Sequence, residues 1–153
     1  YEWRAMTRIL IASHGRTASG LASTLRMFVG DMDIQTIDAY VDGPDDTYDK
    51  DIESFIAGIE SGDAGYIFPD FYGGSVNQRV TTRLIGTGKR NIRLIANINV
   101  PIMIDILTSG GLLSYEEIDE MIEESKTRAV RIEELLCVNS DAGEDDSGFL
   151  DGV

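Results

Sequence analysis

The fold of this chain is decided by the stretch Arg8-Ile9-Leu10-Ile11-Ala12-Ser13-His14-Gly15. A short apolar run that ends in a glycine turn is typical of a buried β-strand, and this one predicts a strand over residues 8–13. In open α/β sheets, ligands and chemistry gather at the carboxyl ends of strands. The single histidine of the chain, His14, stands at that end. It is therefore a candidate phosphoacceptor, metal ligand or general base, and the alternative is a hydrogen-bonded turn residue.

Apolar runs and helix-like periodicity alternate along the rest of the chain. We expect further strands at about 34–40, 65–70 and 92–98, and helices at about 17–29, 47–59, 75–85 and 100–107, with a long last helix at about 114–136. Ser114 and Glu117 have the spacing of a capping box at the start of that helix. The alternation predicts an α/β fold of three layers, with a doubly wound, mostly parallel sheet of flavodoxin-like topology.

Length and composition suit one domain with a full core, since the chain has 153 residues of which 42% are hydrophobic. The apolar runs are too short to span a membrane. One cysteine, Cys137, allows no internal disulfide and is typical of a reducing cytoplasm. We expect residues 1–6 to be a tag or N-terminal extension, residues 7–138 to be the domain, and the acidic stretch 139–153 to be a disordered tail or linker.

Charge is strongly and unevenly acidic. The formal net charge is −14, which argues against nucleic acid as a partner because phosphate backbones require a basic surface. Residues 31–63 contain eleven acidic residues and a single base, Lys50. This segment is interpreted as a solvated face that aids solubility, or alternatively as a docking surface for a basic partner.

The end of the predicted third strand carries a second set of polar residues, Asp70-Phe71-Tyr72-Gly73-Gly74-Ser75. If the first and third strands are neighbours, His14 and Asp70 meet at the carboxyl edge of the sheet. A carboxylate that accepts from one imidazole nitrogen makes the other nitrogen a nucleophile. Gly73 and Gly74 leave backbone N–H groups unobstructed, and Ser75 at the start of a helix completes a cradle for a phosphoryl group. The alternative is a glycine turn with Ser75 as the helix cap.

Three segments together resemble the IIA domains of the mannose family of the bacterial phosphoenolpyruvate-dependent sugar phosphotransferase system (PTS). They are Ile9–Gly15, Asp70–Asn77 and Ala96–Pro101, in the order and spacing of that family. The resemblance covers roughly residues 7–138. Phe71 departs from it, because many members have a small polar residue at that place.

The resemblance implies a cytoplasmic phosphocarrier that works beside a membrane IIC/IID permease. It implies that His14 becomes a phosphohistidine, receives its phosphoryl group from phospho-HPr and passes it to a IIB domain, with no cofactor and no metal. Asp70 would hydrogen-bond the active imidazole, and Ser75 would lie beside the phosphoryl site. The glycines Gly15, Gly73 and Gly74 would complete that site. A homodimer is also implied, with a swapped edge strand for which Leu135–Asn139 is the candidate.

Other functions fit the residues less well. A tetrapyrrole metal chelatase also has a His-Gly pair after its first strand, but a tight metal site is hard to build with one histidine. Gly73-Gly74-Ser75-Val76-Asn77 lacks the last glycine of a hydrolase nucleophile elbow. A regulatory or scaffold domain of flavodoxin-like fold without phosphotransfer is the remaining alternative. Arg16 either meets the phosphoryl group or supports the start of a helix.

Overall fold

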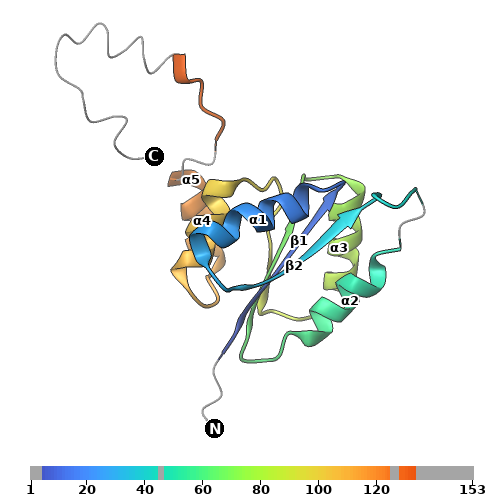
Figure 1. Cartoon of the computed structure of the whole chain (residues 1–153). Helices are drawn as coiled ribbons and strands as arrows, with labels where there is room; N and C mark the ends of the chain where they lie inside the picture. The colour runs from blue at the N-terminus through green and yellow to red at the C-terminus, as the bar shows by residue number, and fades with distance from the viewer. Residues whose placement is uncertain (1–4, 45–46, 125–127, 134–153) are drawn as a thin grey trace, which may run out of the picture.

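The computed structural model of the chain describes residues 5–44, 47–124 and 128–133. Strands and helices alternate along them, as Figure 1 shows. The strands are β1 (Thr7–His14), β2 (Asp33–Ala39), β3 (Ala64–Pro69) and β4 (Ile92–Leu94). The helices are α1 (Thr17–Val29), α2 (Asp49–Gly58), α3 (Ser75–Ile85), α4 (Val100–Ser109) and α5 (Tyr115–Glu124).

The four strands form a parallel sheet in the order β2-β1-β3-β4. This is the flavodoxin-like strand order, and it confirms the expected doubly wound α/β fold. β1 lies in the interior of the sheet and pairs with both β2 and β3, so the ends of three strands meet around His14. The sheet thereby places Ala39, His14 and Pro69 at one edge.

Each face of the sheet has its own hydrophobic core, because alternate side chains of β1 point in opposite directions. Ile9 and Ile11 pack under α1, α4 and α5, whereas Leu10 and Ala12 pack under α2 and α3. Figure 1 shows these two helix layers on either side of the strands. All four side chains are buried, and the six residues of β3 are buried too. This explains why the central strands are continuous apolar runs.

Two elements are shorter than the sequence predicts. β4 ends at Leu94 rather than near residue 98. Beyond it, Asn97 takes a left-handed backbone with φ of 58° and turns the chain toward β3, where Ile98 N donates to Asp70 O. The last helix does begin with the predicted capping box, in which Ser114 and Glu117 each donate a backbone N–H to the other's side chain.

The prediction that this last helix reaches about residue 136 is wrong. α5 ends at Glu124, and residues 128–131 are not helical. Residues 128–133 are exposed, so no apolar face of the kind that stabilises most helices is buried there. The candidate swapped strand Leu135–Asn139 and the tail 139–153 lie outside the described residues. Among the described residues, no helix is both long and apolar enough to cross a membrane.

The start of the domain is tied to the sheet. Met6 N donates to Asp63 Oδ1, and Met6 O accepts from Ala64 N. Asp63 also accepts from Glu60 N, and these two backbone hydrogen bonds lower the pKa of the Asp63 carboxyl below its ordinary value. Met6 is therefore part of the folded domain, although it lies in the range 1–6 that the sequence assigns to an extension.

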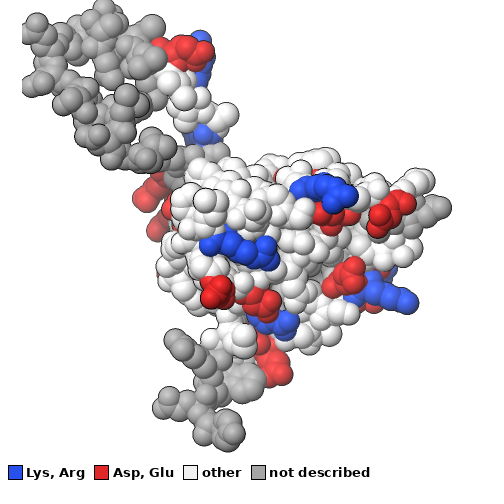
Figure 2. Space-filling view, in the orientation of Figure 1, with Lys and Arg blue, Asp and Glu red and all other residues white. Residues whose placement is uncertain are grey.

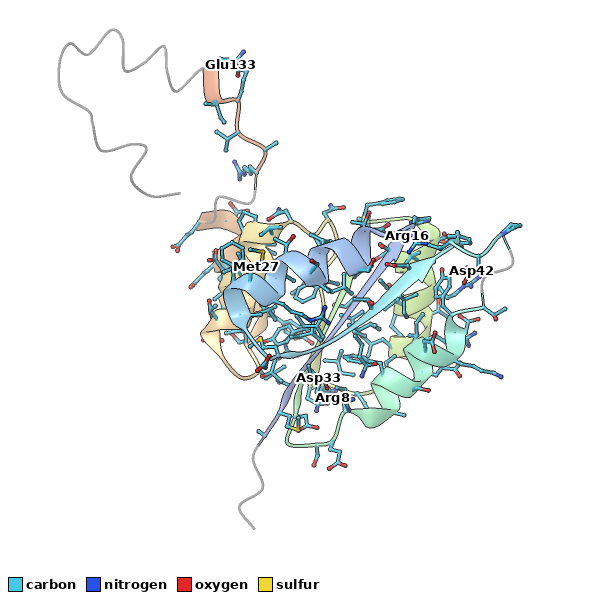
Figure 3. The ribbon with its side chains drawn as sticks, viewed as in Figure 1. Arg8, Arg16, Met27, Asp33, Asp42 and Glu133 are labelled. Carbon is cyan, nitrogen blue, oxygen red and sulfur yellow. The ribbon has the colours of Figure 1, made fainter. Side chains whose placement is uncertain are left out.

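The acidic segment 31–63 is partly neutralised by arginines from other elements. Asp33 pairs with Arg8, and the two lie side by side in Figure 3. Asp49 forms ion pairs with Arg79 and Arg83 of α3, and Glu53 also pairs with Arg83. On the face shown in Figure 2, acidic and basic side chains alternate, and no continuous acidic patch is visible. That face fits the interpretation as a solvated surface.

Candidate functional site

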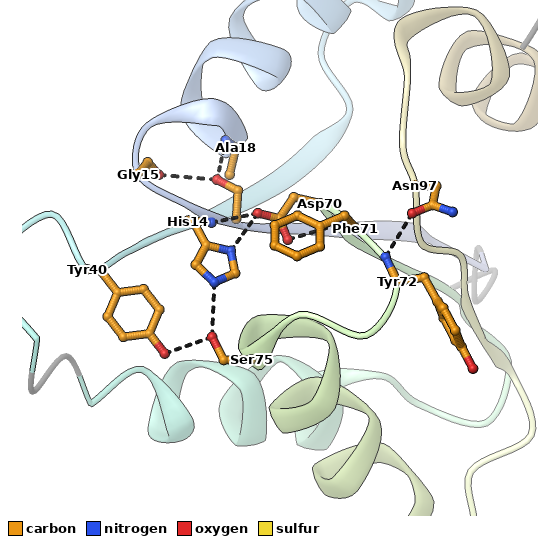
Figure 4. Close-up of polar contacts among 10 residues, drawn as sticks. His14, Gly15, Ala18, Tyr40, Asp70, Phe71, Tyr72, Ser75 and Asn97 are labelled. Atoms are coloured by element: carbon orange, nitrogen blue, oxygen red, sulfur yellow. Dashed lines mark hydrogen bonds and ion pairs between the residues drawn. The ribbon is translucent and has the colours of Figure 1, made fainter. Parts of the chain in front are cut away.

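The site is built where β1 and β3 end side by side (Figure 4). Asp70 follows β3 directly, and its backbone N continues the parallel pairing by donating to Ala12 O at 3.0 Å. Its carboxylate Oδ2 lies 2.8 Å from both the backbone N and the ring Nδ1 of His14. The other oxygen, Oδ1, accepts from Phe71 N at 2.9 Å. Three hydrogen bonds therefore hold the carboxylate against the imidazole.

These contacts determine which nitrogen of His14 is available for chemistry. An ionised carboxylate can only accept hydrogen bonds, so Nδ1 carries the proton and donates it to Asp70. Nε2 then keeps its lone pair. The His14 side chain is 35% exposed, whereas that of Asp70 is 12% exposed. The arrangement holds the imidazole so that, in its neutral form, the nucleophilic nitrogen faces the rim of the sheet.

Nε2 faces the hydroxyl of Ser75, the first residue of α3. Ser75 Oγ lies 3.0 Å from Nε2 and 3.0 Å from the phenol oxygen of Tyr40. Because Nε2 has no proton in this tautomer, the Ser75 hydroxyl donates to it, and the Tyr40 hydroxyl donates to Ser75 Oγ. The helix cap is Gly74, not Ser75, and no side chain of the described residues caps α3. Ser75 therefore points its hydroxyl at the histidine.

Two aromatic rings stack on the imidazole. Phe71 lies with its ring centroid 5.0 Å from that of His14 at an interplanar angle of 17°, and Tyr40 at 5.4 Å and 23°. Figure 4 shows them on opposite sides of the histidine. Phe71, the residue that departs from the family pattern, thus forms one wall of the site. It is 50% exposed.

The glycines have different surroundings. Gly15 and Gly73 have φ of 59° and 81°, values that suit glycine. The Gly15 N–H already donates to Ala39 O at 2.8 Å, and Gly74 N makes a long contact of 3.4 Å to Phe71 O. A Cβ at Gly74 would lie 2.5 Å from Cε2 of Phe71, so Gly74 makes room for that ring. A phosphate-binding role of these glycines stays a prediction.

Neighbouring residues support the site from outside. Ser13 is buried, and its hydroxyl accepts from Ala18 N at 2.7 Å and so holds the start of α1. Asn97 Oδ1 accepts from Tyr72 N at 2.8 Å and so connects the segment Ala96–Pro101 to the turn after Asp70. Arg16 is exposed at the start of α1, and its backbone O accepts from Gly20 N.

The sequence predicts that His14, Asp70 and Ser75 lie together, and the structure joins them through direct hydrogen bonds. Tyr40 was not predicted to lie at the site. The available signal was that Tyr40 follows the second strand, whose end must also lie beside His14 if that strand neighbours the first. No group of three or more His, Cys, Asp or Glu residues that could hold a metal ion occurs in the described part of the chain.

Comparison with known proteins identifies the family. The EIIA-man family, described as the PTS system fructose IIA component, matches residues 8–126. The chain therefore belongs to this family and is a component of the sugar phosphotransferase system. No curated protein matches it.

Two solved structures support the fold. The PTS IIA protein associated with the fucose utilization operon of Streptococcus pneumoniae is 21% identical, with a TM-score of 0.68, over 86% of this chain and 97% of that one. The phosphotransferase system component EIIA from Streptococcus agalactiae is 16% identical, with a TM-score of 0.62, over 84% and 99%. At these identities the likeness is one of fold.

Proposed function

We propose that the protein is a phosphocarrier that accepts a phosphoryl group from phospho-HPr on Nε2 of His14 and passes it to a IIB domain. The observation that carries this proposal is the pair of contacts on the imidazole. Nδ1 donates to Asp70 while the lone pair of Nε2 faces the rim beside Ser75. Family membership supplies the system in which such a histidine works.

The transfer step needs no proton movement. Nε2 of His14 attacks phosphorus with its lone pair, and the P–N bond to the donor histidine breaks, with its electron pair returning to the donor nitrogen. Nδ1 keeps its proton, so the His14 ring becomes positively charged as the new bond forms. The reverse sequence discharges the group to the acceptor. Such a loose transition state requires alignment and charge stabilisation above all.

Each contact of the site has a role in this step. The Asp70 carboxylate stabilises the positive ring, because the opposite charge lies 2.8 Å from Nδ1. The Ser75 hydroxyl turns from Nε2 to an oxygen of the phosphoryl group. That group would lie at the N-terminus of α3, where backbone N–H groups and the helix dipole favour an anion.

The partners would meet the protein at the strand-end rim. His14 is partly exposed and Phe71 and Tyr72 are exposed beside it, so a second protein can bring its own histidine to Nε2. We place the transfer in the cytoplasm, next to a membrane IIC/IID permease that the protein serves indirectly. A homodimer would cover β4, one of the two edges of the described sheet, with the Leu135–Asn139 stretch of a second copy.

The proposed function is tested by intact-mass measurement after incubation with phosphoenolpyruvate, enzyme I and HPr. The wild-type protein should gain one acid-labile phosphoryl group, and His14→Ala should gain none while keeping its thermal unfolding temperature. A protein that stays unphosphorylated with the HPr of its own host, under conditions in which that HPr is itself phosphorylated, would instead be a regulatory domain. Sedimentation of the full chain tests the homodimer separately.

A further inference from the structure

Tyr40 holds its position beside His14 at a cost to the backbone. It follows β2 with φ of 64°, in the left-handed region that side-chain-bearing residues avoid and glycine enters freely. Ala39 O, one residue earlier, accepts from Gly15 N at 2.8 Å and ties this corner to the turn after His14. Strained residues of this kind gather at functional sites, where the surrounding structure holds them. The strain is explained if the site requires this side chain.

The Tyr40 ring is supported from behind. Tyr48, which is buried, meets it edge-on with ring centroids 6.0 Å apart and an interplanar angle of 84°. The guanidinium of Arg79 lies 4.7 Å from the centroid of the Tyr48 ring. The phenol of Tyr40 is thereby held between a buried aromatic residue and the imidazole, with little freedom to leave the histidine.

We infer that Tyr40 is a positioning residue for phosphoryl transfer: its hydroxyl orients that of Ser75, and its ring, together with Phe71, holds the plane of the imidazole. This inference rests on the proposed function and deepens it. The hydroxyl part acts through Ser75, because the Tyr40 oxygen lies 3.0 Å from Ser75 Oγ. The ring part acts on His14 directly through the stacked face.

Both parts favour the charged, phosphorylated state. Once Ser75 turns its proton to the phosphoryl group, the Tyr40 hydroxyl continues to donate to Ser75 Oγ and polarises it into a stronger donor. The imidazole becomes positive at the same time, and the faces of Tyr40 and Phe71 attract a cation. The contacts that orient the neutral ring thus also stabilise its phosphorylated form.

The test is a double-mutant cycle on the rate of phosphoryl acceptance at saturating phospho-HPr. Tyr40→Phe keeps the ring and should slow the step about fivefold, the effect of one neutral hydrogen bond. In a Ser75→Ala background the same change should have no effect beyond twofold, since its target is gone. Tyr40→Leu also removes the ring and should be about fivefold slower again in both backgrounds. The KM for phospho-HPr should stay constant.

Backbone strain does not distinguish these variants, because each keeps a Cβ at the same left-handed position. Tyr115→Phe, at the exposed first residue of α5, is the matched control and should behave as wild type. The inference is wrong if wild type is phosphorylated and both Tyr40→Phe and Tyr40→Leu accept the phosphoryl group as fast as wild type. It is also wrong if Tyr40→Phe still slows the step fivefold in the Ser75→Ala background. A wild-type protein that accepts no phosphoryl group would instead overturn the proposed function, and this inference with it.

Discussion

Oδ2 of Asp70 lies 2.8 Å from the backbone N of His14 and 2.8 Å from its Nδ1, although the two residues are 56 positions apart. One carboxylate oxygen thus holds both the backbone at the end of β1 and the imidazole ring of the same residue. The backbone contact restrains the position of the carboxylate, and the ring contact then determines the tautomer of the histidine. Orientation and chemistry of the site depend on the same atom.

Asp70→Asn should therefore slow phosphoryl acceptance more than it destabilises the fold. The amide oxygen can take the place of Oδ2, but the negative charge next to the imidazolium is lost. The amide NH2 group then faces the N–H of Phe71, so the hydrogen bond from Phe71 N is lost. Loss of one charge-assisted interaction predicts a rate roughly 10- to 100-fold lower in rapid-quench phosphorylation. Asp31→Asn, on the exposed turn after α1, is the control. A full-speed Asp70→Asn protein would contradict the assigned role.

Ser75→Ala should have a smaller effect. It removes one neutral hydrogen bond to Nε2 and one donor to the phosphoryl group, which predicts a loss of about 1 kcal/mol, or roughly fivefold in rate. Ser109→Ala removes a hydroxyl that donates to Asp105 O in α4 and should leave the rate unchanged. A loss as large as that of Asp70→Asn would mean that Ser75 does more than donate a hydrogen bond.

Gly74→Ala should separate activity from stability. Its backbone, with φ of −71° and ψ of 163°, accepts an alanine, but the new Cβ would meet the Phe71 ring at 2.5 Å. Because that ring is half exposed it can swing away, so unfolding should change by less than about 1 kcal/mol. Phosphoryl acceptance should fall as the stacking on His14 is lost.

Gly20→Ala, in α1, is the matched control for Gly74→Ala. A Cβ at Gly20 meets nothing within 4 Å, so this variant should gain about 0.5–1 kcal/mol of stability with unchanged transfer. If Gly74→Ala unfolds several kcal/mol more easily, or transfers at the wild-type rate, the role given to Phe71 as a wall of the site is wrong.

Asp63→Asn should give a pH-dependent loss of stability. The hydrogen bonds from Met6 N and Glu60 N lower the pKa of Asp63 below its ordinary 3.8. A lowered pKa stabilises the fold above the unfolded-state value, and this contribution disappears as pH falls through the lower folded value. At pH 7 the variant should be about 1–3 kcal/mol less stable in urea unfolding.

The difference in unfolding free energy between Asp63→Asn and wild type should narrow once the pH falls below 3.8, where the Asp63 carboxyl of the unfolded chain begins to take up a proton, and should vanish below the lower pKa of the folded state. The exposed Asp31→Asn should show little difference from wild type at any pH. If the difference in unfolding free energy between Asp63→Asn and wild type stays constant down to pH 2, the ionic role of this carboxyl is contradicted.

The local sequence pattern was sufficient to predict two kinds of element: strands that are apolar on both faces, and helices whose periodicity continues up to their ends. The run 8–13 predicts β1 because a central parallel strand is buried on both faces. The bounds of α1 and α3 match at residues 17–29 and 75–85, where the periodicity is helical throughout. β4 and the end of α5 could not be predicted in this way, because the left-handed backbone of Asn97 ends the strand and the described residues 128–133 are exposed, with no buried face to stabilise a longer helix.

For the site, the sequence by itself determined the residue types: a lone histidine at one strand end, and a carboxylate and a hydroxyl at another. Only the tertiary structure decided which atoms meet. The order of the strands brings Asp70 to Nδ1, the start of α3 aims Ser75 at Nε2, and the left-handed end of β2 lays Tyr40 on the ring. The physical reason is that strand pairing and helix docking bring together residues that are 26 to 61 positions apart, and no local propensity encodes those contacts.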